Sequence, residues 1–216
     1  NISYCYISGS MQPGGIALSL AGGLVGHLQG GIVDNCNVTL TSFTSLWDHV
    51  GGLAGRVSAG AIINYCNVNL PMGLSGRDHV GGLAGSIEST VNIYNSSVNP
   101  STSYVTGNSN VGGFVGYSDL TPPGVLVNCA ADIYVSGNDC VGGLVGQARG
   151  TTIREGIARG NTGTAVISTN SCAGGLVGAA SNTIISNCSA YPQVYGSSNT
   201  GGIAGLLDSS VIYNCY

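Results

Sequence analysis

Two Asp-His dipeptides are the residues of this chain whose types and spacing first suggest chemistry. They are Asp48-His49 and Asp78-His79, and imidazole and carboxylate groups together bind zinc and related divalent metals, with water completing the shell. The candidate metal ligands are therefore Asp48, His49, Asp78 and His79. The equivalent position further along is Ser109-Asn110 and no further ligand is evident, so we favour exposed polar stacking and expect no cofactor.

Six of the eight cysteines fall in one sequence register. They are Cys5, Cys36, Cys66, Cys129, Cys188 and Cys215. The same register holds Ser96 and Gly156 in the remaining positions, so it selects small side chains, and a buried free cysteine behaves as a small hydrophobic residue. Paired CxxC spacing typical of zinc sites is absent. We expect these six thiols to be reduced, buried and structural.

Cys140 and Cys172 stand apart from that register, directly before Val141 and Ala173. If they lie on neighbouring strands, their Cα atoms are about 4.8 Å apart, within the range that a disulfide spans. We therefore consider a Cys140–Cys172 disulfide, with two free thiols as the alternative because in-register parallel pairs orient their Cβ atoms poorly.

Eleven tyrosines are spread along the chain. Exposed aromatic rings on a rigid surface stack on sugars and anchor protein partners. Three of them lie close to a strand predicted in each repeat and are our candidate ligand-facing aromatics: Tyr104, Tyr134 and Tyr195. Packing between stacked strands is the competing interpretation.

A glycine cassette that recurs seven times must position all of these residues. Its copies are 22-GGLVG-26, 51-GGLAG-55, 81-GGLAG-85, 112-GGFVG-116, 142-GGLVG-146, 174-GGLVG-178 and 201-GGIAG-205. From one copy to the next, the position of the first glycine advances by 29, 30, 31, 30, 32 and 27. A period of this length is the mark of a stacked repeat architecture, in which each repeat packs only on its neighbours.

Each repeat carries three short apolar stretches that read as strands. The cassette supplies one, and a β-branched pair before the small-residue register supplies another. We predict that the third has this inward column: Thr44, Leu74, Val105, Val135, Ile167 and Val194. Three strands per turn of about 30 residues, with glycine at tight bends, predict an all-β parallel β-helix. We expect a right-handed coil because parallel crossovers prefer that hand.

Composition limits the function. Only 6% of the residues are charged, with five arginines, no lysine and a net charge of -4, which excludes a basic nucleic-acid surface. No apolar run is long enough to span a membrane, and a neutral Asn, Ser and Thr surface favours an extracellular or cell-surface setting. We expect residues 1–216 to form a single solenoid domain of about seven turns, cut from a longer chain.

The cassette at 141-VGGLVG-146 and the following pattern Ile-x-Asn-Cys, as at 185-ISNC-188, resemble the GLUG motif repeats. This resemblance implies a large secreted or surface-anchored protein, chiefly bacterial, of the kind found in adhesin-like proteins and beside IgA-protease-type metallopeptidase domains. The chain departs from the pattern around Gly156 and where Ala21, Ala173 and Thr200 replace the valine before the cassette. It contains no His-Glu-x-x-His zinc signature, so peptidase activity does not carry over.

We therefore expect a non-enzymatic extracellular repeat segment that acts as an adhesin stalk or a ligand-presenting rod. Its expected partners are host-surface glycans or proteins, or other copies of the chain joined end to end.

Three alternatives remain. A filament subunit is suggested by bare strands at both ends of the solenoid. A carbohydrate-active enzyme needs paired acids, and we expect no pairing among Asp34, Glu88, Asp119, Asp132 and Asp208. An ice-binding face needs a regular Thr-x-Thr column, whereas Thr39-Leu40-Thr41 occurs once.

Overall fold

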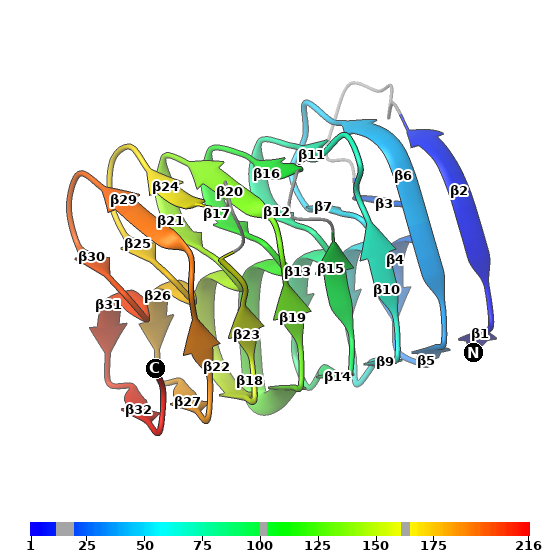
Figure 1. Ribbon diagram of the computed structural model, residues 1–216. Helices are drawn as coiled ribbons and strands as arrows, with labels where there is room; N and C mark the ends of the chain where they lie inside the picture. Colours follow the sequence, from blue (N-terminus) through cyan, green and yellow to red (C-terminus); the bar gives the residue numbers. More distant parts are fainter. Residues whose placement is uncertain (12–19, 100–102, 161–164) are drawn as a thin grey trace.

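The computed structural model describes residues 1–11, 20–99, 103–160 and 165–216. Within these ranges the chain is all β and forms three sheets in which every paired strand is parallel. Figure 1 shows a parallel β-solenoid, and the smallest sheet contributes one strand to each of its seven turns. The predicted architecture, with its period of about 30 residues per turn, is confirmed.

The three sheets are named A, B and C here. Sheet A has 13 strands, mostly two per turn: β1 (Ile2–Ser3), β4 (Val25–Gln29), β5 (Ile32–Asp34), β8 (Ala54–Ser58), β9 (Ile62–Asn64), β13 (Ala84–Glu88), β14 (Asn92–Tyr94), β18 (Val115–Val127), β22 (Val145–Arg154), β26 (Val177–Ser181), β27 (Ile184–Ser186), β31 (Ala204–Asp208) and β32 (Val211–Tyr213).

Sheet B has 12 strands: β2 (Tyr6–Met11), β6 (Asn37–Thr44), β10 (Asn67–Asn69), β11 (Leu74–Ser75), β15 (Ser97–Asn99), β16 (Tyr104–Thr106), β19 (Ala130–Ala131), β20 (Tyr134–Gly137), β23 (Ile157–Ala158), β24 (Ala165–Ser168), β28 (Ser189–Ala190) and β29 (Gln193–Gly196). Sheet C has seven: β3 (Ala21–Gly22), β7 (Val50–Gly51), β12 (Asp78–Gly81), β17 (Ser109–Gly112), β21 (Asp139–Gly142), β25 (Ala173–Gly174) and β30 (Thr200–Gly201).

One turn of the coil runs from sheet C through sheet A to sheet B. Strand β12 of sheet C leads through the cassette to β13 and β14 of sheet A, and then to β15 and β16 of sheet B. In Figure 1 the sheet B strands lie in front and run upward, the chain turns back at the top into sheet C, and later turns are added toward the C-terminus. The coil is therefore right-handed.

The cassette glycines lie where the backbones of sheets C and A touch. A Cβ atom added to Gly51 would lie 2.0 Å from the Ala54 carbonyl oxygen and 2.7 Å from the Ala84 Cα. One added to Gly55 would lie 2.5 Å from the Ala21 nitrogen. None of the cassette glycines has a positive φ, so of the two reasons for glycine at a bend, close backbone approach is the one that applies here.

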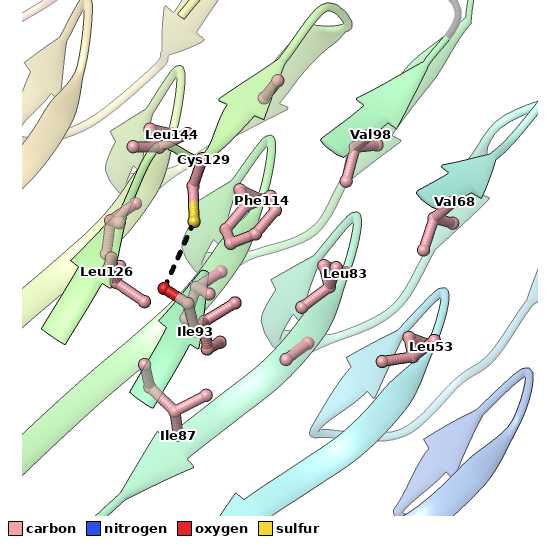
Figure 2. Close-up of a cluster of buried hydrophobic side chains, with 14 of the residues drawn as sticks. Leu53, Val68, Leu83, Ile87, Ile93, Val98, Phe114, Leu126, Cys129 and Leu144 are labelled. Atoms are coloured by element: carbon pink, nitrogen blue, oxygen red, sulfur yellow. Dashed lines mark hydrogen bonds between the residues drawn. The ribbon is translucent and has the colours of Figure 1, made fainter. Parts of the chain in front are cut away.

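The third cassette residue fills the core beside these glycines. Leu53, Leu83, Phe114 and Leu144 follow one another along the axis and are at most 1% exposed, with Val68 and Val98 in sheet B across from them (Figure 2). Burying a side chain of this size stabilises the fold by about 1.5–3 kcal/mol. Because every turn repeats the same set, the core is a stack of like residues.

The predicted inward column of sheet B is wrong at two positions. Leu74 pairs with Phe43, and Val135 pairs with Val166. Phe43 and Val166 are buried at 1% and 0% exposure, whereas the predicted Thr44 faces solvent. The same slip of one residue replaces Ile167 by Val166. In both turns the link from sheet B to sheet C is one residue longer, and a slip of one residue turns a strand's other face inward.

Candidate functional site

The two candidate histidines meet on the outside of the corner between sheets C and A. His49 and His79 precede the buried valines of β7 and β12 and have φ values of 53° each. The Nδ1 atoms of the two rings are 3.4 Å apart, and the Nδ1 of His49 is 2.7 Å from the Ser86 hydroxyl oxygen. The His79 ring stacks on Tyr117, with centroids 4.9 Å apart and planes inclined by 16°. Three successive turns thus contribute to one polar cluster.

The carboxylates of the two dipeptides turn away from these rings. Arg77 donates to both oxygens of Asp48, at 2.8 and 2.5 Å, and its Nε lies 3.5 Å from Asp78. Asp78 also accepts hydrogen bonds from the Asn108 amide and the Ser109 backbone, each at 3.1 Å. The described residues contain no cluster of three or more His, Cys, Asp or Glu side chains that could hold a metal. The two imidazoles come together without their carboxylates.

Burial keeps both imidazoles neutral near pH 7. Desolvation is the main cause that lowers the pKa of His49 below 6.5, and the charge of His79 lowers it further. Desolvation likewise lowers the pKa of His79. The Asp48 carboxyl has its pKa lowered chiefly by its hydrogen bonds from Arg77. The corner therefore presents neutral ring nitrogens next to an exposed ion pair.

Glu88 and Asp119 correct the expectation that the acidic residues do not pair. They are direct cross-strand partners in β13 and β18. Arg56 forms an ion pair with Glu88 on one side, and Arg149 lies 3.8 Å from Asp119 on the other. The two carboxylates border a polar hollow of about 360 Å³ that is also lined by Ser89, Tyr117 and Thr121.

The missed signal for this pair is the cassette register, because Glu88 and Asp119 each lie seven residues after the first glycine of their cassettes, Gly81 and Gly112. The insertion comes after the pair. From Asp119 to Val125 the chain uses two residues more than from Glu88 to Asn92, and the pairing of β18 shifts register between Asp119 and Gly124. An irregularity at one turn of a regular repeat is visible in the sequence as a longer spacing. It begins after Asp119 and leaves the pairing of Asp119 with Glu88 in the regular register.

The three candidate tyrosines lie on the outward face of sheet B, but in two columns. Tyr104 pairs directly with Tyr134, whereas Tyr195 pairs with Ile167 in the neighbouring column. Tyr104 and Tyr195 are 45% and 53% exposed, and the Tyr195 hydroxyl donates to the Gln193 side chain at 2.7 Å. Three turns thus present aromatic rings to solvent on one side of the rod.

A family model for the GLUG motif matches residues 17–42 and 169–190. Both matches include a glycine cassette and continue toward the small-residue corner, which are the two features that each turn repeats. The chain is a GLUG-motif β-solenoid. Comparison with curated proteins and with solved structures found no match, so the family resemblance rests on the motif.

The cysteine register forms the corner between sheets A and B of the GLUG solenoid. The Cys66 thiol donates to the Asn64 carbonyl at 3.2 Å, and the Ser96 hydroxyl donates to the Tyr94 carbonyl at 2.7 Å. The Ser96 oxygen also accepts the Cys66 backbone N–H at 3.0 Å. Figure 2 shows the Cys129 thiol at the same corner. A small side chain with one polar atom thus satisfies backbone groups where the strand ladder turns.

All six corner thiols are free. Four of them are buried as predicted, whereas Cys5 and Cys215, which lie in the first and last turns, are only half-buried. Burial is the main cause that raises the pKa of Cys66 to about 11, Cys129 to about 12 and Cys188 to about 11. Because the thiolate is the reactive and metal-binding form, this register is suited to packing and hydrogen bonding.

Cys140 and Cys172 lie on adjacent turns, since Val141 pairs with Ala173. Both thiols are free, Cys172 is 4% exposed, and Cys140 is half-buried. Burial first, and then the neighbouring Cys172 thiol, raises the pKa of Cys140 to about 11.

Among the described residues no helix is long and apolar enough to cross a membrane.

Proposed function

We propose that this GLUG solenoid is a non-enzymatic extracellular repeat segment that works as an adhesin stalk or a ligand-presenting rod. The observation that carries the proposal is the in-register stacking of its turns, which gives a stiff body with a repeated, neutral and hydrogen-bonding surface. The interior residues that build the stack serve packing, so the outward positions are free to vary with a ligand.

Ladders of polar side chains stiffen that surface. The Asn95 amide donates to Asn64 at 3.2 Å, and the Asn128 amide donates to Asn95 at 2.9 Å. On the other side of the rod, Asn138 donates to Asn108 at 2.6 Å. Amide ladders along stacked strands hold side chains in fixed positions, and pre-ordered side chains lose little entropy when they bind a partner.

The partners of the polar clusters favour a non-enzymatic function. Glu88 and Asp119 are each paired with an arginine, and the hollow beside them is open and polar. The Ser86 hydroxyl lies 2.7 Å from the His49 ring nitrogen, but Ser86 is fully buried, so this serine is not open to a substrate as a nucleophile. Recognition needs only an ordered surface, which every turn provides.

Screening the purified chain against an array of glycans and extracellular host proteins tests the proposal. We expect a saturable interaction that is lost when Tyr104, Tyr134 and Tyr195 are replaced together by alanine. The matched control is Tyr65→Asn, because Tyr65 is a 53% exposed tyrosine at the A–B corner and asparagine occupies that column in neighbouring turns. A ligand bound equally by the triple variant would place recognition elsewhere, and no ligand at any spot would leave a spacer role.

A further inference from the structure

We propose that His49 and His79 form a binding site for a zinc ion, with both Nδ1 atoms as ligands and water completing the tetrahedron. The proposal is independent of glycan or protein binding. The proposed ligand set differs from the one suggested by the sequence, because Asp48 and Asp78 are bound to Arg77 and do not face the metal.

The separation of the two nitrogens favours this metal. Zinc binds imidazole nitrogen at about 2.0–2.1 Å with tetrahedral angles, so two such ligands lie about 3.3–3.4 Å apart. The two Nδ1 atoms are 3.4 Å apart. Square-planar copper would instead require about 2.9 Å between neighbouring nitrogens. The rings therefore already have the spacing of two zinc ligands.

The backbone and a neighbouring ring hold this spacing. Both histidines occupy left-handed backbone positions at φ 53°, directly before paired residues of β7 and β12. The Tyr117 ring stacks on His79. A site whose ligands are fixed before binding loses less entropy when the metal arrives.

The surroundings also suit a cation. The charged groups near the rings are Asp48, Asp78, Glu88 and Arg56, together with Arg77, which is ion-paired with Asp48 and Asp78. The acidic groups outnumber the basic ones by one. Zinc on the His49 Nδ1 would replace the hydrogen bond that this nitrogen makes with the Ser86 hydroxyl at 2.7 Å, so the serine must turn away when the metal binds.

Calorimetric titration of the purified chain with zinc chloride at neutral pH tests the site. We expect one saturable site in the wild type and a loss of zinc affinity of more than about tenfold in His49→Asn and in His79→Asn. Removing a residue that only hydrogen-bonds to a metal ligand already lowers metal affinity by about 10–100-fold. Asparagine is chosen because Asn110 fills the same column with φ 54°. His27→Asn, a change at a histidine bonded to Ser58, is the matched control and should bind as the wild type does.

No saturable uptake by the wild type would overturn the proposal, as would unchanged affinity in either variant or equal loss in His27→Asn. Zinc should also protect the His49 and His79 rings from diethyl pyrocarbonate in the wild type and leave His27 reactive. This second measurement needs no variant, and full modification of all three rings in the presence of zinc would again count against the site.

Discussion

Replacing Gly113 by alanine should break the contact on which the stack of turns depends. A Cβ atom at Gly113 would lie 2.2 Å from the carbonyl oxygen of Gly143 in the next turn and 3.0 Å from the Ala131 Cβ. The obstacle is backbone, which cannot rotate away as a side chain can. Core overpacking costs about 1–3 kcal/mol, and because the two strands must separate we expect about 3 kcal/mol or more.

The second cassette glycine of the last turn provides a matched control. Gly202 is the equivalent cassette glycine, but a Cβ atom there would meet nothing within 4 Å, and its φ is not positive. Gly202→Ala should therefore be neutral, or stabilising by up to about 1 kcal/mol through the unfolded chain.

Thermal unfolding followed by circular dichroism separates the two variants. For a chain of this size, about 3 kcal/mol lowers Tm by about 6–12 °C, so Gly113→Ala should melt well below the wild type and Gly202→Ala beside it. Equal Tm values for Gly113→Ala and the wild type, or an equal loss in both variants, would refute the close-contact argument for the cassette.

Three further predictions concern the polar and sulfur columns. Cys66→Ala should lower the unfolding free energy by about 1–3 kcal/mol and Cys66→Ser by less than half as much, because Ser96 already makes the same corner bonds; equal losses in urea melts would contradict this. Because burial holds the pKa of His79 below 6.5, the unfolded chain binds more protons than the folded one, and the unfolding free energy should fall as the pH drops below 6.5. His79→Asn should reduce this dependence of stability on pH, and an unchanged dependence would contradict the burial argument. Mild oxidation with glutathione disulfide should join Cys140 to Cys172 and leave Cys66 reduced, and a non-reducing peptide map with both thiols free would end the disulfide hypothesis.

The repeat could be predicted because it is written in the spacing of glycines. The cassette, the small-residue corner and the parallel coil all follow from that regular period, and the structure confirms them. The sequence allows two reasons for glycine at a bend, and the structure shows that close backbone approach is the one that applies in the cassette. Gly51 and Gly55 permit two backbones to touch. Non-glycine residues such as Asn35, with φ 51°, adopt left-handed backbone positions.

The two shifted inward positions of sheet B could not be predicted, because they depend on local departures from the period. One extra residue before β7 moved the inward position from Thr44 to Phe43. The pairing of Glu88 with Asp119 could have been predicted, since both lie seven residues after the first glycine of their cassettes. The choice of Asp48 to bind Arg77, 29 residues away, and not its neighbour His49 depends on which way each strand faces at a corner.

Quantitative binding of the strongest array ligand is the most direct test of the proposed role. The account predicts a saturable titration for the wild type, the same Kd for Tyr65→Asn, and at least about a tenfold weaker Kd for the variant lacking Tyr104, Tyr134 and Tyr195, since an anchoring aromatic contributes about 2 kcal/mol or more. Identical Kd values for all three proteins would contradict a recognition surface on the outward face of sheet B.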